Sequence, residues 1–125
     1  MSKPTLTTID LFLDDDNYEF IDIREISECV TSGMIEGFKI LPFYSLLKAG
    51  EAFYPIDYTF KDWAFNDIEA FKKHFDSDKT QVLICNSGNR TQALKKALDF
   101  LGYDCIDIGG IIDYKGKHLM KPKLN

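Results

Sequence analysis

The sequence predicts an α/β domain whose mainly parallel sheet is covered by helices on both faces. Short apolar stretches typical of strands are followed along the chain by segments with helical periodicity. Such alternation favours parallel strands joined by helical crossovers. No internal repeat, low-complexity stretch or linker divides the 125 residues, so we expect one domain over residues 1–125.

The first part of the chain predicts four short elements in the order helix, strand, helical turn and strand. They cover residues 7–13, 18–23, 25–30 and 39–41. Thr7 or Thr8 could cap the first helix through its hydroxyl group. Pro42 ends the second strand because proline lacks the N–H that a sheet requires.

The second part predicts two further strands, each accompanied by helices. An amphipathic helix, a strand, a second helix, the last strand and a short final helix cover residues 62–75, 82–85, 90–101, 103–108 and 111–115. Gly102 supplies the stop after the second helix. Residues 43–61 are rich in aromatic side chains, and we expect an insertion there: a lid, a partner surface or a loop held over the core.

Composition excludes several classes of function. The net charge is −5 without a basic face, which argues against a nucleic-acid partner. No apolar run approaches the about 18 residues that span a membrane, and the N-terminus lacks the apolar core of a signal peptide. We therefore expect a cytoplasmic protein with reduced thiols. Its cysteines, Cys29, Cys85 and Cys105, have no metal-ligand spacing, so no metal site is expected.

The most informative segment is the loop that begins at Cys85. An apolar strand ends on this cysteine, and a helix starts directly behind it, so backbone N–H groups and the positive helix end converge on the sulfur. Such surroundings lower a thiol pKa and activate the thiolate as a nucleophile, provided that the sulfur is exposed. The alternative is a buried, inert cysteine at the end of a strand. Gly88 permits an anion-binding backbone geometry, and Thr91 can cap the helix. Arg90 either brings positive charge to the rim or is the structural partner of a carboxylate.

Three motifs in this sequence resemble those of the rhodanese-like domains, the single-domain sulfurtransferases. Their active loop, Cys-x-x-Gly-x-Arg-Ser/Thr, is similar at every defined position to Cys85-Asn86-Ser87-Gly88-Asn89-Arg90-Thr91. Their first motif is Asp-x-Arg at a strand end, then Glu, then Gly-His-Ile-x-Gly-Ala and Pro. It resembles Asp22-Ile23-Arg24, Glu28, residues 33–38 and Pro42. Their closing Gly-Gly, followed by tryptophan, resembles Gly109-Gly110 with Tyr114 in the aromatic place.

The resemblance implies a three-layer sandwich with a central sheet of about five strands. It implies a double displacement in which Cys85 takes a sulfane sulfur as a persulfide and passes it to a thiol or to cyanide. The loop from Asn86 to Thr91 would hold the persulfide, and Asp22 and Arg24 would support the loop from a neighbouring strand end. No metal or organic cofactor is implied. Met34 replaces the usual histidine and Phe38 the usual alanine, which could alter packing at the entrance.

The sulfur donor implied by the resemblance is thiosulfate, a persulfide, mercaptopyruvate or a persulfide-donating protein. Family members that use thiosulfate well carry basic residues in this loop, whereas Asn86, Ser87 and Asn89 are neutral. We therefore expect weak use of thiosulfate, which is a dianion, and favour a persulfide donated by another protein.

Two other kinds of function remain open. A binding, regulatory or redox-sensing module could keep this fold without catalysis. A cysteine phosphatase or arsenate reductase is disfavoured, because the phosphatases that share the fold place arginine six positions after cysteine. Here Arg90 follows Cys85 by five positions, which implies a tighter loop around the bound group.

We expect a core position for Cys105, surface positions for His74 and His118, and a packing role for Trp63. A resolving thiol at Cys29 is a further alternative.

Overall fold

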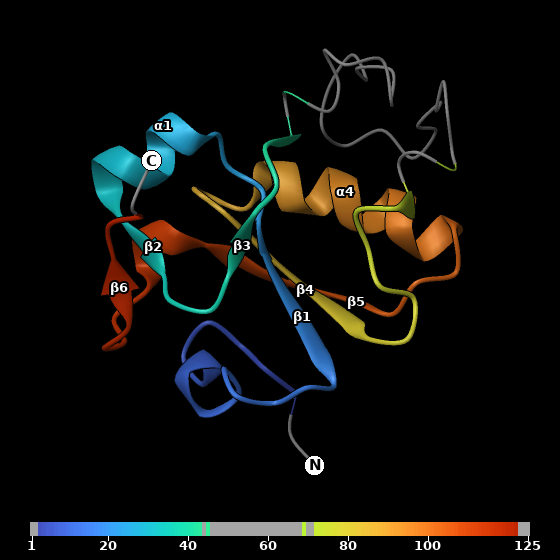
Figure 1. The fold of residues 1–125 in the computed structure, drawn as a ribbon, viewed down its shortest axis with the longest axis horizontal. Helices are drawn as coiled ribbons and strands as arrows, with labels where there is room; N and C mark the ends of the chain where they lie inside the picture. The colour runs from blue at the N-terminus through green and yellow to red at the C-terminus, as the bar shows by residue number, and fades with distance from the viewer. Residues whose placement is uncertain (1–2, 44, 46–68, 70–71, 123–125) are drawn as a thin grey trace.

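A computed structural model describes residues 3–43, 45, 69 and 72–122, and within them a four-stranded parallel sheet forms the centre of the domain (Figure 1). The strands lie in the order β3-β1-β4-β5 and cover Lys39–Ile40, Tyr18–Asp22, Thr80–Cys85 and Cys105–Gly110. The α/β class and the parallel sheet are therefore as predicted. The described residues supply four of the about five strands implied by the resemblance.

A small antiparallel sheet was not predicted from the sequence. It pairs β2 (Met34–Ile35) with β6 (Leu119–Met120). Each strand is two residues long, which is too short for an alternating pattern to be recognised in the sequence. The pairing ties the end of the described chain back to the segment after α1.

Within the described residues, four helical segments have both of their bounds defined. They are η1 (Ile9–Leu11), α1 (Ile26–Ser32), α4 (Asn89–Phe100) and η2 (Ile111–Asp113). The predicted helix over residues 7–13 is reduced to a single 3-10 turn, and Thr8 forms hydrogen bonds with Thr5 instead of capping it. The predicted final helix is likewise only a 3-10 turn. Gly102 follows α4 with φ of +90°, as expected for a helix stop.

The two faces of the sheet bury separate apolar clusters. Alternate side chains of β1 and β4 point to opposite faces, because successive residues of a strand alternate. Ile21, Leu83 and Cys85 pack with α4, whereas Phe20, Val82 and Ile84 pack with η1, α1 and β2. This arrangement gives the predicted three layers.

Several predictions fall on residues outside those described. They concern the insertion over 43–61, apart from Phe43 and Ser45, most of the helix over 62–75, and Trp63. Phe75, at the end of that helix, is buried in the α4-side cluster and contacts Tyr103 edge-on. Across the described stretches, no helix is both long and apolar enough to cross a bilayer.

Candidate active site

Cys85 is the last residue of β4 and lies under the loop that connects β4 to α4. Its side chain points to the α4 face, and the residue is 1% exposed. The sequence predicts an exposed, reactive thiol with a buried cysteine as the alternative, and the structure has the thiol buried. The reason is the strand alternation, which directs the sulfur into the layer between the sheet and α4. A reagent can reach Cys85 only when a neighbouring group moves.

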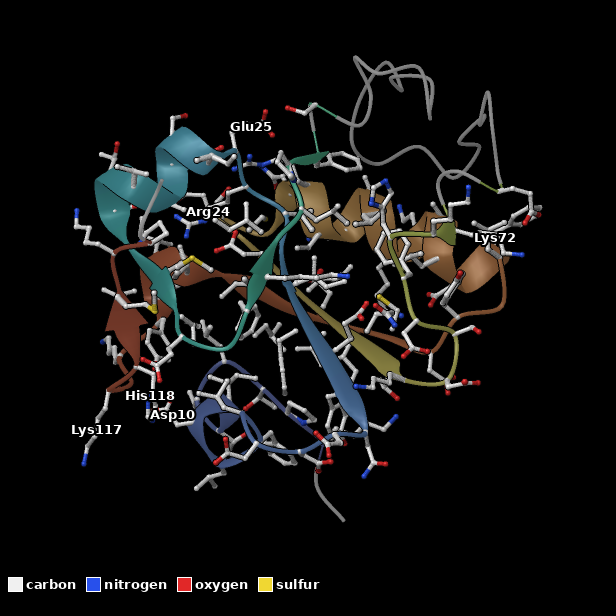
Figure 2. The ribbon with its side chains drawn as sticks, in the orientation of Figure 1. Asp10, Arg24, Glu25, Lys72, Lys117 and His118 are labelled. Atoms are coloured by element: carbon white, nitrogen blue, oxygen red, sulfur yellow. The ribbon has the colours of Figure 1, made fainter. Side chains whose placement is uncertain are left out.

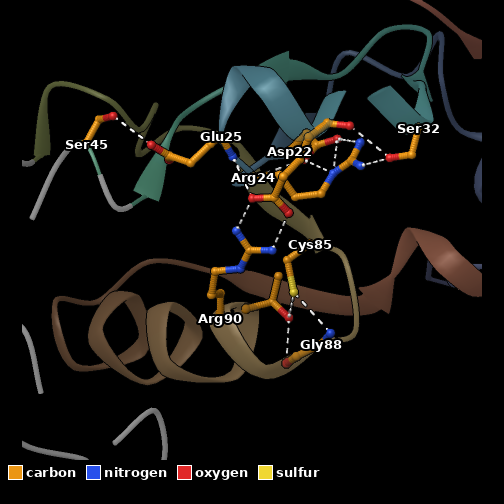
Figure 3. A network of polar contacts seen from close by, with 10 residues as sticks. Asp22, Arg24, Glu25, Ser32, Ser45, Cys85, Gly88 and Arg90 are labelled. Atoms are coloured by element: carbon orange, nitrogen blue, oxygen red, sulfur yellow. Dashed lines mark hydrogen bonds and ion pairs between the residues drawn. The ribbon is translucent and has the colours of Figure 1, made fainter. Parts of the chain in front are cut away.

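The sulfur has two polar neighbours from the loop and the first turn of α4. The Gly88 N–H donates a hydrogen bond to Sγ at 3.1 Å, and Thr91 Oγ1 lies 3.6 Å from the same atom (Figure 3). Gly88 has φ of +98°, a conformation that strongly favours glycine. The loop therefore directs one backbone donor at the sulfur.

Thr91 has a different role from the helix cap that was predicted. Gly88 occupies the N-cap position of α4, and the Thr91 side chain is fully buried inside the first turn. Its hydroxyl donates to the Gly88 carbonyl oxygen at 3.0 Å. Because this bond uses its single proton, the hydroxyl oxygen can only accept a hydrogen bond from the Cys85 thiol.

The glycine pair at the end of β5 forms the floor of the loop. Gly110 pairs with Cys85 after an irregularity in the β4–β5 ladder. A Cβ atom at Gly110 would lie 2.6 Å from Ser87 Cα, so only glycine fits there. The Ile112 N–H also donates to the Asn86 carbonyl oxygen at 3.3 Å. These contacts hold the start of the loop against β5.

Arg90 contacts a carboxylate on α1. Its two terminal nitrogens donate to the two carboxylate oxygens of Glu28 at 2.7 and 2.8 Å, a bidentate ion pair (Figure 3). The side chains of Arg90 and Glu28 are 12% and 34% exposed. The hydrogen bond from Arg90 holds the pKa of Glu28 below its ordinary value, although burial opposes this. Of the two interpretations of Arg90, the carboxylate partner is the one observed.

Glu28 is the residue whose function the sequence analysis missed. The motif included it, but neither the motif nor the spacing indicated that it contacts the loop. Besides binding Arg90, its carboxylate accepts the Glu25 N–H at 3.2 Å and closes a capping box at the start of α1. A Glu three residues after the N-cap was therefore a recognisable signal for the helix start, but not for the Arg90 contact.

Asp22 and Arg24 form a second ion pair, and this one is completely buried. Arg24 Nη2 lies 2.8 Å from Asp22 Oδ2, and Arg24 Nε donates to Asp22 Oδ1 at 3.0 Å. The guanidinium also donates to Ser32 Oγ at 2.9 Å and to the Gly33 carbonyl at 2.7 Å. Burial alone would lower the pKa of Arg24, but Asp22 outweighs it and the pKa is raised. These bonds fix the C-terminal end of α1.

One polar residue of the loop, Asn86, lines a shallow depression beside α1. Asn86, Ser87 and Asn89 are exposed. Asn86 lines a depression of about 320 Å³ together with four residues of α1: Ser27, Glu28, Thr31 and Ser32. The α1 side of the loop therefore presents hydroxyl groups, one amide and one carboxylate.

The two other cysteines are not placed for reaction. Cys29 is fully buried, and burial, with the neighbouring Asp22 charge, raises the pKa of its thiol to about 11. Cys105 is partly buried at the start of β5, against the core as predicted, and burial raises its pKa to about 12. Both thiols are therefore protonated at neutral pH, which argues against a resolving role for Cys29.

The departures from the family motif lie away from the loop. Met34 and Phe38 are buried in the cluster on the face opposite Cys85, where Phe38 packs on Phe20. Tyr114 donates to Asp10 at 2.5 Å. Asp10 and His118 lie together at the end of the molecule away from Arg24 (Figure 2).

The comparisons with known proteins agree with the architecture. Residues 5–116 match the family of the rhodanese-like domain. No curated protein sequence matches the chain. Solved structures do match. A rhodanese-like domain protein from Staphylococcus aureus has a TM-score of 0.65 and 17% identity, covering 98% of this chain and 100% of its own.

Two further solved structures are similar in fold. A rhodanese-related protein from Thermoplasma volcanium has a TM-score of 0.63 and 24% identity, covering 96% of this chain and 100% of its own. A Rhodopseudomonas palustris protein described as a possible tyrosine phosphatase has a TM-score of 0.56 and 21% identity, covering 88% of this chain and 77% of its own. At these identities the likeness establishes the fold alone.

Proposed function

Because the chain belongs to the rhodanese-like domain family, we propose that it is a sulfurtransferase in which Cys85 carries sulfur as a persulfide. The observation that carries this proposal is the Gly88 N–H, which lies 3.1 Å from Cys85 Sγ. It is a preorganised donor for an anionic sulfur, in a loop supported by Gly110 and by the Arg90–Glu28 ion pair.

In the first step the Cys85 thiolate attacks the outer sulfur of a donor. With a persulfide donor, the new bond joins Cys85 Sγ to the outer sulfur, and the donor's own S–S bond breaks. The donor thiol leaves with the electron pair of that bond and takes up a proton. With thiosulfate the leaving group is sulfite. No net oxidation occurs, because one sulfur atom moves between two sulfur nucleophiles.

In the second step a thiol acceptor removes the outer sulfur from Cys85. The acceptor thiolate attacks this sulfur, the Cys85 Sγ–S bond breaks, and Cys85 leaves as the thiolate. The product is the acceptor persulfide, or thiocyanate when cyanide is the acceptor. The loop N–H groups between Asn86 and Thr91 hold the intermediate persulfide anion. The reaction needs no metal or organic cofactor, and it predicts ping-pong kinetics.

Burial of Cys85 means that the reaction includes a conformational step. At 1% exposure the Cys85 sulfur cannot attack a donor in line unless the loop or a residue packed on it moves. Loop movements of this kind are common gates in enzymes. The proposal therefore includes a transient opening of the site before the donor binds.

The same burial favours a second candidate function. A thiol that stays buried would be inert, and the domain would then act as a binding, regulatory or redox-sensing module. A phosphatase has less support. Arg90 follows Cys85 after only four intervening residues, and its bidentate contact is with Glu28.

The experiment is intact-protein mass spectrometry after brief exposure to thiosulfate, a small persulfide or mercaptopyruvate, with Cys85→Ser as the control. The proposal expects a gain of one sulfur atom on the wild-type protein only, removed again by cyanide. If none of these small donors loads Cys85 while the thiol can still be alkylated, either a dedicated protein donor or the non-catalytic module replaces sulfur transfer from small molecules. Hydrolysis of an aryl phosphate that depends on Cys85 would instead indicate a phosphatase.

A further inference from the structure

We infer that Glu28 determines which donors the site accepts, by cancelling the positive charge of Arg90 and placing a carboxylate beside the loop of Cys85. The site would then select persulfides whose remaining part is uncharged or cationic, and would disfavour dianionic thiosulfate. This inference rests on the proposed sulfurtransferase function and assigns its donor class.

The ion pair is the first observation. Arg90 is the one charged side chain in the loop sequence from Cys85 to Thr91. Both of its terminal nitrogens contact the Glu28 carboxylate, at 2.7 and 2.8 Å. A bidentate pair of this kind fixes the guanidinium toward α1 and neutralises its charge. The loop therefore presents no net positive charge to an incoming anion.

The shape of the surface is the second observation. The depression beside the loop joins Asn86, the residue that follows Cys85, to residues of α1. Its five lining residues are Ser27, Glu28, Thr31, Ser32 and Asn86, and Glu28 is the only charged one among them. Hydroxyl and amide groups bind an uncharged or ammonium-bearing substituent, whereas a sulfonate group would lie beside a carboxylate.

A cation near α1 does not restore the positive charge that Glu28 cancels. Lys121 donates to the carbonyl oxygens of Val30 and Thr31, at the C-terminal end of the helix. Those carbonyl groups carry the negative end of the helix dipole, so they compensate the ammonium group. Glu28 belongs to the first turn of the same helix and is bound to Arg90.

The structure offers a variant that changes the charge and keeps the fold of α1. In Glu28→Gln the amide oxygen can still accept the Glu25 N–H, because a capping box accepts Gln as well as Glu at this position. The matched control is Glu36→Gln. It changes the net charge equally, and Glu36 is exposed and lines a separate depression with Asp10 and His118.

The experiment measures single-turnover loading of Cys85 by mass spectrometry with four donors. Three are persulfides of mercaptoethanol, cysteamine and mercaptopropionate, which place a hydroxyl, an ammonium or a carboxylate on the same two-carbon spacer. The fourth is thiosulfate. For the wild-type protein we expect the ammonium and hydroxyl donors to load faster than the carboxylate donor, with thiosulfate slowest.

In Glu28→Gln the preference should shift toward anions. Loading by thiosulfate relative to the mercaptoethanol persulfide should rise about tenfold, as expected when one unit of repulsion is removed from a dianion several Å away. Added salt should reduce the difference between donors of opposite charge. Glu36→Gln should leave all ratios unchanged.

The outcomes separate this inference from the proposed function. If Glu28→Gln changes all four rates by one common factor, Glu28 only supports the loop; the inference is overturned and sulfur transfer stands. If the three persulfide donors load the wild-type protein at equal rates, the inference is also overturned. This result does not depend on whether the variant folds. If none of the four small donors loads the wild-type protein, sulfur transfer from small donors fails and the inference fails with it.

Discussion

Two ion pairs lie close together in this domain, but their surroundings differ. The Asp22–Arg24 pair is fully buried and binds the end of α1, whereas the Glu28–Arg90 pair is partly exposed and binds the loop of Cys85. Each lies near a cysteine: burial and Asp22 raise the pKa of Cys29, and Cys85 precedes Arg90 by five residues. Figure 3 shows Asp22 and Arg24 beside α1, with Arg90 reaching toward them from α4 below.

The difference shows how burial decides what an ion pair contributes. A buried pair must keep both partners, because one charge left alone in the interior is strongly unfavourable. A partly exposed pair is screened by water and contributes little to folding, so its residues can vary with the chemistry of the site. The first pair therefore maintains the fold, and the second is free to influence the reaction.

Breaking the buried pair should have the largest effect. Asp22→Ala leaves the Arg24 guanidinium buried without its carboxylate, and the free energy of unfolding should fall by about 3–5 kcal/mol. Denaturant titration measures this. Asp22→Ala with Arg24→Met, which removes both charges, should recover part of the loss. If the free energy of unfolding of Asp22→Ala falls by less than about 1 kcal/mol, the buried ion pair does not stabilise the fold to this extent.

Crowding the floor of the loop should have the next largest effect. In Gly110→Ala the new Cβ meets the backbone at Ser87, so the loop must shift at a cost of about 1–3 kcal/mol. The rate at which Cys85 is loaded with sulfur should also fall, because the shift of the loop moves the Gly88 N–H.

Gly102→Ala provides the control, since no atom lies within 4 Å of the added carbon while φ is +90°. This variant should lose stability through strain and keep its loading rate. Equal loading rates in the Gly110 and Gly102 variants would show that the floor does not position the loop.

Neutralising the exposed pair should have a small effect on stability that depends on pH. Glu28→Gln should lower the free energy of unfolding by about 0.2–1 kcal/mol at neutral pH. Because Arg90 lowers the pKa of Glu28 in the folded protein, the contribution is present above the ordinary value of 4.5 and is lost as pH falls through the folded pKa. The difference between variant and wild type should therefore vanish in acid. If the free energies of unfolding of Glu28→Gln and the wild type differ equally at neutral and at acid pH, the ion pair with Arg90 is not the source of the difference.

The smallest effect is expected at the cysteine beside the buried pair. With a pKa of about 11, Cys29 has a thiolate fraction of about one in a thousand at pH 8, and it is also buried. Alkylation of the native protein, mapped by peptide mass spectrometry, should leave Cys29 and Cys105 unmodified, and unfolding in guanidinium should expose both. Rapid labelling of native Cys29 would show that α1 opens readily.

Local patterns were sufficient to predict the main sheet and the position of Cys85. The parallel strands have apolar runs, and the end of β4 is marked by Cys85 followed by Gly88. Features that depend on contacts between distant residues were not predictable in this way. The Glu28–Arg90 pair joins residues that are 62 positions apart, and the β2–β6 pairing joins segments of two residues each.

Burial of Cys85 was also beyond local reasoning. A strand-end cysteine before a polar loop indicates exposure in the sequence, and the loop itself is indeed exposed at Asn86 and Ser87. Whether the sulfur follows the loop or the core depends on the face of the sheet to which it points. That face is fixed by the strand register and by the packing of α4, which no single segment specifies.

The strand order has a consequence for how the chain folds as it is synthesised. β1 lies between β3 and β4, and its pairing with β4 joins Tyr18 to Thr80. Translation delivers β1 first, so one edge of it has no strand to pair with until β4 has left the ribosome. The glycine floor of the loop at Gly110 follows later still. A nascent chain therefore contains the whole Cys85 loop before the end of β5, against which the loop packs, has been synthesised. The site can form only when nearly the whole domain has emerged from the ribosome.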